Sequence, residues 1–267
     1  MNRMYFLDVT CSGLGISVEL NDIALVNELT GESIRETQPV NNWLRSEANT
    51  LTVKLTPALP EPNESLVFGE QSASVVLFIS ELGAQTIQVG KVLSSFSWPL
   101  TATDTEVTFV LPYEFSERTD ELVPMPCNMV LWNKTSPIAA LSSQDKKNIY
   151  DCVKHLSSLI MSKHTIEAFQ FMGLKYQDQA LADNKPISRL QAAAIEMWEH
   201  MASMPGLELQ EIAPDELRYD LVGHSHLVNV TRLDGAPAVL FEDHEDEMYF
   251  GLPLMFGLVE GKWRVVR

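Results

Sequence analysis

The stretch PIAALSSQDKKNIYDCVKHLSSLI, residues 137–160, marks the point where the chain changes from strand to helix periodicity. Before it, apolar residues mostly alternate with polar ones, which is the two-residue period of strands. Within it, apolar residues recur at helical spacing, and Ser142 followed by Asp145 predicts a helix start. The apolar face consists of Ile149, Val153, Leu156 and Ile160. The sequence therefore predicts an all-β region first and a helix-containing region second.

Short alternating runs with turn residues between them fill the first half of the chain. Asn21-Asp22 predicts a tight turn between two of these runs. The Pro-rich loop at 57–63 excludes a central strand, because proline lacks a backbone donor. About eight short strands at this spacing predict a sandwich or an open barrel. The predicted strands include residues 4–10, 16–20, 23–29, 50–55, 73–81, 86–93 and 106–111.

One segment of this half, residues 38–55, resembles a stretch of the galactose-binding-like jelly-roll sandwiches, in which a turn carrying Asn leads into a core strand. Ala48 stands where that stretch usually has Gly. The resemblance implies a jelly-roll-like β-sandwich and implies no sugar ligand. The matching residues are Trp43, Leu44, Asn49, Leu51, Val53 and Leu55.

The second half begins with three predicted helices, the first over the quoted stretch, the second over 165–182 and the third from 187 or 188 to 201. Ile166 and Met197 are assigned to buried helix faces, together with Tyr176 and Trp198. Strands then return, with Asp234-Gly235 and Glu260-Gly261 as hairpin turns. The predicted strands are 208–212, 217–222, 227–232, 238–242, 248–258 and 262–266.

The final hairpin, LMFGLVEGKWRVVR at 254–267, is similar to the last hairpin of nuclear-transport-factor-2-like (NTF2-like) domains, which are cystatin-like cones. The resemblance implies three helices packed on a curved antiparallel sheet, an α+β plan, and by itself implies no function. Pro124, Pro126 and Pro137 predict a semi-rigid connector. We therefore expect a β-sandwich domain at 1–122, a Pro-rich connector at 123–140 and an α+β cone-like domain at 141–267.

Charge is the unusual global property, since 36 acidic and 19 basic residues give a net charge of -17. Residues 1–140 carry 7 basic and 17 acidic side chains (-10), and residues 141–267 carry 12 and 19 (-7), so both halves are acidic. Such a field disfavours nucleic acid and anionic membranes and favours a basic protein partner, although surplus acid can also serve solubility alone. The sequence does not indicate an oligomeric state.

Three cysteines with no CxxC spacing suit a reduced compartment, so a cytoplasmic location is expected. No run approaches the length of a membrane span, and Asp8 interrupts the N-terminus before a signal peptide could form.

Two histidines, His224 and His226, stand at i and i+2, which on a strand would place both on one side. They predict a metal site, a polar pocket wall or a solvated surface turn, and no third metal ligand lies at a recognised spacing. Tyr176 and Asp178 are further candidates for lining the mouth of a cone. These four residues are the candidate ligand-binding set.

An acidic run, Glu242-Asp243-His244-Glu245-Asp246-Glu247, is expected at a hairpin tip. It lacks the glycine-punctuated pattern of a calcium loop, so we expect a solvated tip or a contact patch for a basic partner. Trp132 in the connector is a second candidate contact, with an ordinary edge strand as the alternative for its segment.

Nucleotide-binding, hydrolase, zinc-protease and redox motifs are absent from the sequence. We therefore expect a non-catalytic cytoplasmic protein-binding module of two domains, with no cofactor and no metal. A bacterial immunity or adaptor protein that masks a basic effector would have this character. The alternative is a small-molecule-binding protein or enzyme that uses the cavity of the cone-like domain, where Asp and His would act as general bases.

Overall fold

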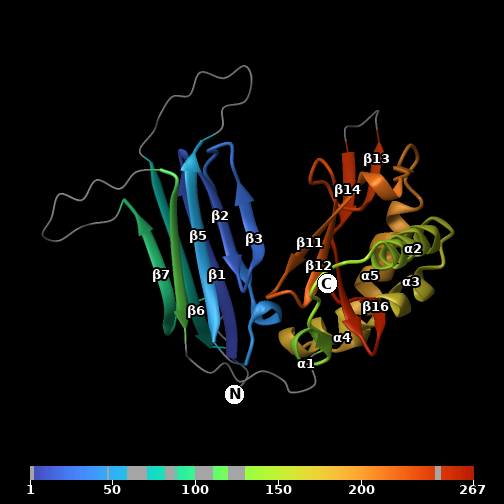
Figure 1. Cartoon of the computed structure of the whole chain (residues 1–267), viewed down its shortest axis with the longest axis horizontal. Coiled ribbons are helices and arrows are strands. Elements are labelled where there is room, and N and C mark those ends of the chain that lie inside the picture. Colours follow the sequence, from blue (N-terminus) through green and yellow to red (C-terminus); the bar gives the residue numbers. More distant parts are fainter. Residues whose placement is uncertain are drawn as a thin grey trace, which may run out of the picture. The chain divides into compact units, whose positions relative to one another are not determined.

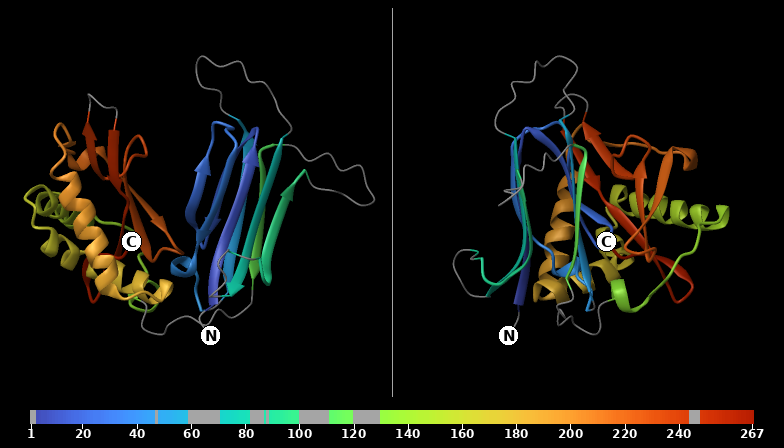
Figure 2. Two further views of the ribbon diagram at one scale, coloured as in Figure 1. Left: turned by 180° about the vertical axis from the view of Figure 1, so that it is seen from behind. Right: turned by 60° about the vertical axis from the view of Figure 1, so that its left-hand side comes forward.

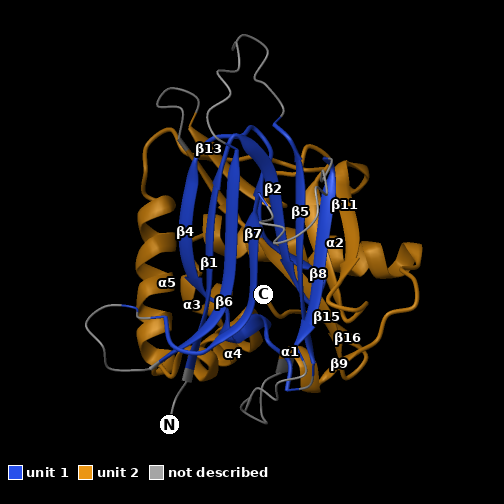
Figure 3. Ribbon diagram, turned by 90° about the vertical axis from the view of Figure 1, so that its left-hand side faces the viewer, with its two compact units in different colours: residues 1–125 blue, residues 126–267 orange. Residues whose placement is uncertain are grey.

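The computed structural model describes residues 3–46, 48–58, 71–81, 87, 89–99, 111–119, 130–243 and 248–267. The chain divides into two compact units, residues 1–125 and 126–267 (Figure 3). The described part of the first unit consists of antiparallel strands and one short 3-10 turn, whereas the second unit combines helices with antiparallel sheets. The coarse prediction, a strand region followed by a helix-and-sheet region, is confirmed.

The described residues of the first unit form two antiparallel sheets of four strands each (Figures 1 and 2). Its elements are β1 (Arg3–Ser12), β2 (Leu14–Leu20), β3 (Ile23–Glu28), β4 (Ile34–Pro39), η1 (Asn41–Trp43), β5 (Asn49–Pro57), β6 (Ser72–Glu81), β7 (Val92–Trp98) and β8 (Tyr113–Thr119). One sheet has the order β4-β1-β6-β7 and the other the order β3-β2-β5-β8.

Both sheets of this unit contribute to one hydrophobic core. Leu7 and Val9 of β1 are fully buried, as are Leu51, Val53 and Leu55 of β5, so the predicted alternation in β5 is confirmed. Full burial of such a side chain is worth about 1.5–3 kcal/mol, which makes this core the main favourable term in the unit.

The turn between β2 and β3 is the predicted Asn21-Asp22 pair. Their φ angles are 55° and 63°, a left-handed conformation that Asn and Asp adopt more readily than most residues and that suits the twist of a hairpin. The Asn21 side chain also donates to the Trp43 carbonyl at 2.8 Å and to Asn49 Oδ1 at 2.9 Å. The turn is thereby held against the start of β5.

The outer strands of this unit were predicted poorly. A strand was expected at 86–93, but β7 begins only at Val92, and β4 and β8 were missed. All three lie at sheet edges and bury few side chains, so their apolar signal is weak. The strand expected at 106–111 lies almost entirely outside the described residues.

The second unit places its helices on one face of its sheets (Figure 1). Its helical elements are α1 (Val130–Asn133), α2 (Ser143–Met161), α3 (Thr165–Phe171), α4 (Gly173–Asp183), α5 (Ile187–Met201) and η2 (Pro214–Glu216). Its strands are β9 (Thr135–Ser136), β10 (Glu208–Leu209), β11 (Leu217–Val222), β12 (Leu227–Arg232), β13 (Val239–Asp243), β14 (Met248–Leu252), β15 (Leu254–Val259) and β16 (Lys262–Val265).

The start of α2 has the predicted cap. Ser142 accepts a hydrogen bond from the Asp145 backbone N–H at 3.2 Å, and the Asp145 carboxylate accepts one from the Ser142 N–H at 3.0 Å. The Ser142 hydroxyl also donates to the Asp145 carboxylate at 2.6 Å, and Trp263 Nε1 of β16 donates to the other carboxylate oxygen at 3.0 Å. The hydrogen bonds from Ser142 and Trp263 hold the pKa of Asp145 below its usual value. The apolar face of α2 is buried as predicted.

The single helix predicted over 165–182 is two helices, because the chain bends at Met172 between α3 and α4. Met172 itself is buried, so the bend fits the core at this point. Ile166 of α3 is 56% exposed and Met197 of α5 is 42% exposed, although both were assigned to the core. Both assignments were wrong because periodicity alone did not fix the limits of the buried stripe on each helix.

The strands of the second unit form two sheets. One has the order β11-β12-β15-β16, with β9 paired to β15, and the other has the order β10-β13-β14. The strand predicted over 248–258 is interrupted at Pro253, where β14 ends and β15 begins in the other sheet. The single-strand prediction was therefore wrong, because proline cannot donate to a ladder.

The described part of the predicted connector at 123–140 contains regular secondary structure. Residues 130–140 include α1 and β9, and β9 pairs with β15, so this part of the segment belongs to the second unit. The Pro124 and Pro126 positions lie outside the described residues.

Candidate functional site

The two candidate histidines lie in a turn and not on a strand. Residues 223–226 connect β11 to β12, and His224 and Ser225 have φ angles of 52° and 63°. The placement of His224 and His226 on one side of a strand does not occur, because Gly223 starts the turn with a positive φ of its own; of the three interpretations offered by the sequence, the turn is the one whose backbone is found. His224 is exposed, whereas His226 is half-buried.

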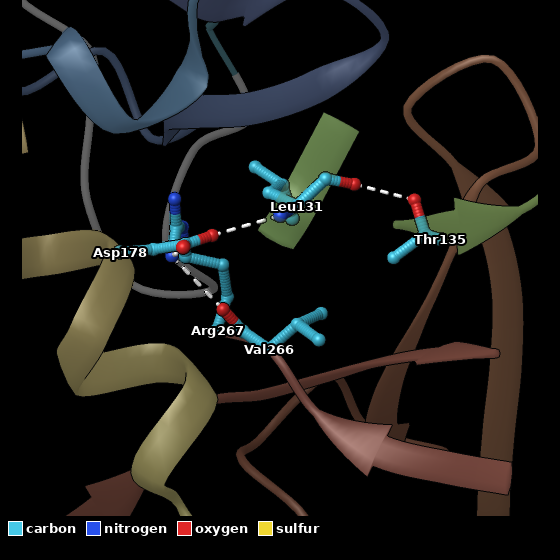
Figure 4. A network of polar contacts seen from close by, with 5 residues as sticks. All are labelled: Leu131, Thr135, Asp178, Val266 and Arg267. Carbon is cyan, nitrogen blue, oxygen red and sulfur yellow. Dashed lines mark hydrogen bonds and ion pairs between the residues drawn. The ribbon is translucent and has the colours of Figure 1, made fainter. Parts of the chain in front are cut away.

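Asp178 is fully buried and belongs to a network of polar contacts (Figure 4). Its Oδ2 accepts a hydrogen bond from the Leu131 backbone N–H at 2.8 Å and lies 3.8 Å from Arg267 Nη1. Arg267 also donates to the Val266 carbonyl at 2.9 Å. The Asp178 carboxylate thus links α4, α1 and the residues after β16, so its contacts serve to hold these segments of the fold together.

His226 lies at the other end of the same network. The Thr135 hydroxyl donates to the Leu131 carbonyl, so its proton is already engaged (Figure 4). His226 Nδ1 lies 3.1 Å from the Thr135 carbonyl oxygen, and we infer that Nδ1 carries the proton and donates to it. The structure therefore connects Asp178 and His226 through α1 and β9, and both side chains hold the fold together.

Tyr176 is the remaining member of the candidate set and lies in the helical core. Its ring stacks on Phe169 with centroids 4.5 Å apart and meets Trp198 edge-on at 6.3 Å. Burial raises the pKa of Tyr176 to about 12. The four candidate residues are thus not gathered around one hollow, and their role in ligand binding stays a prediction.

Lys175, next to Tyr176, was not singled out from the sequence. Burial and, to a smaller extent, the positive charge of Arg267 together lower its pKa to about 8. Burial likewise lowers the pKa of Arg267 to about 10, against the opposing effects of Asp178 and Asp183. Helix α4 therefore carries a partly desolvated cluster of ionisable side chains.

The residues predicted to contact a partner occupy different surroundings. Trp132 is half-buried and packs against the histidine turn, since a Cβ at Gly223 would lie 3.2 Å from its ring. Asp243 is only 5% exposed, and its carboxylate faces Gly206, so this residue is not part of a solvated tip. Glu242 of β13 is half-buried. The predicted contacts Glu245, Asp246 and Glu247 lie outside the described residues.

A cavity of about 530 Å³ opens between α2 and the segment that runs from β10 through η2. We call it the α2 groove. It is lined by Tyr150, Val153, Lys154, Ser157 and Ser158 of α2, by Leu209 to Ala213 with Pro214 and Glu216, and by Ala238. Its size is that of ligand-binding sites in general. Sequence reasoning missed it, because no motif marks residues 209–216.

The α2 groove combines apolar and acidic side chains. Val153 and Ala238 are buried, whereas Glu211 and Glu216 are exposed at the other wall. Of the lining residues that the structure describes, Lys154 is the single cation, and two carboxylates with one ammonium give a formal charge of -1. This pairing of an apolar surface with carboxylates suits a ligand that is itself both apolar and cationic.

Two hydrogen bonds fix the wall formed by residues 209–216. The Tyr150 hydroxyl donates to the Ile212 carbonyl at 3.0 Å, and the Ala213 N–H donates to Glu216 Oε2 at 2.7 Å. Lys154 lies with its Nζ 5.8 Å from the Tyr150 ring centroid. The groove is therefore preformed on the α2 side and on the opposite wall.

Within the described ranges, no three His, Cys, Asp or Glu side chains are grouped so that they could hold a metal ion. Among the helices of the same ranges, none combines the length and the hydropathy that crossing a membrane would require.

Comparison with known proteins gave no relative: no protein-family model, no curated protein and no solved structure matches this chain.

Proposed function

We propose that this chain is a non-catalytic protein-binding module and that the α2 groove receives a basic, partly apolar segment of its partner. The observation that carries this proposal is the composition of the groove, an apolar surface beside two exposed carboxylates in a chain of net charge -17. A partner segment with Lys or Arg next to aliphatic side chains would be complementary to it, and the field of the chain would speed its capture.

The fold families of the two units, the location and class of the protein, and its additional contact residues belong to the same proposal. Two four-stranded antiparallel sheets support a jelly-roll-like sandwich in the first unit, and helices that precede a strand-rich segment support an NTF2-like cone in the second. A cytoplasmic immunity or adaptor protein that masks a basic effector would use such a module. Trp132 and the acidic segment 242–247 remain proposed as additional contacts.

One observation favours the alternative, a protein that binds a small molecule or acts on it: the groove has the volume of a metabolite site. The candidate acid and base residues argue against catalysis there, because Asp178 and His226 do not line the groove and are engaged in the network of Figure 4.

The experiment uses a substitution that blocks the groove without changing charge. Ser158 is exposed on α2 and lines the groove, so Ser158→Trp would fill its opening while leaving the core intact. The control is Ala193→Trp, which places the same ring on an exposed position of α5. A labelled peptide of alternating Lys and Leu is titrated against both variants and against the wild type by fluorescence anisotropy.

We expect Ser158→Trp to weaken binding of this peptide by at least about tenfold, and Ala193→Trp to leave it unchanged. Glu211→Gln is expected to weaken binding less, about threefold, with the exposed Glu196→Gln as its control. Equal binding to the wild type and Ser158→Trp would mean that the peptide responds only to net charge, and the proposal would be wrong. Capture from native lysate at low and high salt, with the same variants, extends the test to natural partners.

A further inference from the structure

A second cavity of the same unit, about 450 Å³ in volume, has the opposite charge. It lies between the α3–α4 junction, the turn after α1 and the β15–β16 hairpin, and we call it the β16 cavity. Among its described lining residues, three are cations, namely Lys134, Lys262 and Arg264, and Glu260 is the one carboxylate. The formal charge of this described lining is therefore +2, in a chain whose total is -17.

The three cations are not neutralised by neighbouring carboxylates. In the described part of the chain, none of them has a carboxylate oxygen within 4.0 Å, whereas Lys54, Lys185 and Arg218 do. An acidic protein that collects unpaired cations around one hollow creates a local positive potential, which attracts anions from solution.

Other groups of the β16 cavity suit an anion as well. Gln170 and Gln177 are exposed and supply amide N–H donors. Helix α4 begins at Gly173 on the wall of the cavity, with no acidic residue in its first turn and no side-chain cap.

The chemistry of these cations indicates what kind of anion would be bound. The guanidinium of Arg264 presents paired donors that match two oxygens of one phosphate or carboxylate group, and lysines supply point charges beside it. Phe171 and Leu174, both half-buried, form an apolar part of the wall. A volume of about 450 Å³ is larger than an inorganic ion requires and suits a small metabolite.

We propose that the β16 cavity binds a small polyanionic metabolite through Lys134, Lys262 and Arg264, with its clustered negative charges carried by phosphate or carboxylate groups. This site goes beyond the proposed function, shares no lining residue with the α2 groove, and does not depend on any protein partner.

The test is calorimetric titration of the full-length chain with pyrophosphate and with citrate at low ionic strength. Both probes carry clustered charge, and acetate serves as the monovalent comparison. Lys262→Gln with Arg264→Gln is expected to weaken binding by at least about tenfold. The matched control removes the same charge at two exposed positions outside the cavity, Lys147→Gln with Arg189→Gln, and is expected to retain binding within about twofold.

A second variant reduces the volume of the β16 cavity and leaves its charge unchanged. A Cβ at Gly173 would meet no atom of another segment within 4 Å, so there is room for a side chain to begin here, and Gly173→Leu is expected to reduce the volume of the cavity; leucine is also the better helix former. We expect this variant to keep its thermal stability and to bind the tighter probe at least about fivefold more weakly.

Tighter binding of pyrophosphate would assign the site to phosphorylated metabolites, and tighter binding of citrate would assign it to polycarboxylates; either result supports the proposal. It would be overturned if neither probe bound, if acetate bound as tightly, or if the cavity variants and the control bound alike.

Discussion

The two units bury different kinds of polar groups. In the first unit, the fully buried polar side chains include Asn21 and Asn49, two neutral amides that hydrogen-bond to each other and to turns. In the second unit, the fully buried Asp178 lies 3.8 Å from Arg267, and the charge of the same guanidinium contributes to the lowered pKa of Lys175. The first unit therefore joins its segments through hydrogen bonds between neutral amides, whereas the second unit joins its segments through charged side chains.

The difference has an energetic meaning. A buried amide that loses its partner costs about 1–3 kcal/mol, whereas a buried charge that loses its partner costs about 3–5 kcal/mol. Charges also respond to pH, and amides do not. We therefore expect the second unit to be the more sensitive of the two to single substitutions and the one that carries the alkaline pH dependence.

The largest effect is expected for Asp178→Ala, which removes the carboxylate that lies 3.8 Å from the buried Arg267 and accepts the Leu131 N–H. The free energy of unfolding should fall by about 3–5 kcal/mol. Hydrogen exchange followed by mass spectrometry should show faster exchange in α1, α4 and β16 and unchanged exchange in β1 to β8. Asp151→Ala, an exposed position on α2, is the control. Faster exchange throughout the strands of the first unit would contradict the contrast between the units.

A smaller effect is expected for Asn49→Ala in the first unit. Asn49 Oδ1 accepts hydrogen bonds from the Asn21 side chain at 2.9 Å and from the Arg45 N–H at 2.7 Å. Loss of these bonds should lower the free energy of unfolding by about 2 kcal/mol, independently of pH between 5 and 9. Urea unfolding at several pH values measures both quantities, and the exposed Asn27→Ala should cost far less. A pronounced pH dependence of the loss would argue against neutral hydrogen bonding as its cause.

An effect of comparable size but of opposite sign is expected for Lys175→Met. The folded pKa of about 8 lies below the ordinary value of 10.5, so the unfolded chain binds more protons at this side chain between these pH values. The cost of the buried ammonium is fully present below pH 8 and disappears as pH rises toward 10.5. Lys175→Met should therefore raise the free energy of unfolding at pH 7, by on the order of 2 kcal/mol.

Urea unfolding of the wild type and Lys175→Met from pH 7 to pH 10 tests this sign. The difference between the two proteins should shrink steadily over that range, while the exposed Lys147→Met should show no comparable trend. A variant that is less stable than the wild type at pH 7 would show that the ammonium has a favourable role that its pKa does not reveal.

The sequence could predict what depends on neighbouring residues. The cap formed by Ser142 and Asp145, the Asn21-Asp22 turn and the bounds of β11 and β12 all follow from local pattern, and all are confirmed. Edge strands such as β4 could not be found in this way, because an edge strand needs few buried side chains. The bend at Met172 depends on how α3 and α4 meet the rest of the core, which no local pattern encodes.

The candidate sites were harder to predict than the fold. Asp178 was selected as a polar residue near a possible cavity, but its carboxylate pairs with Arg267, which lies 89 positions later in the sequence (267 − 178). The β16 cavity draws Lys134, Gln170 and Arg264 from three distant segments, and no spacing rule joins them. A site assembled by tertiary packing leaves no contiguous motif, and only the three-dimensional arrangement reveals it.

The break at Pro253 determines where the second unit would tolerate a change in chain length. A single residue separates β14 in one sheet from β15 in the other. Because side chains alternate along a strand, an inserted residue here would turn Phe256 away from the core and Leu258 toward it, or would force β15 to slide along β12. Loop grafts and peptide tags are therefore better placed at the exposed Asp234-Gly235 turn, which lies outside this break and lines neither of the two cavities.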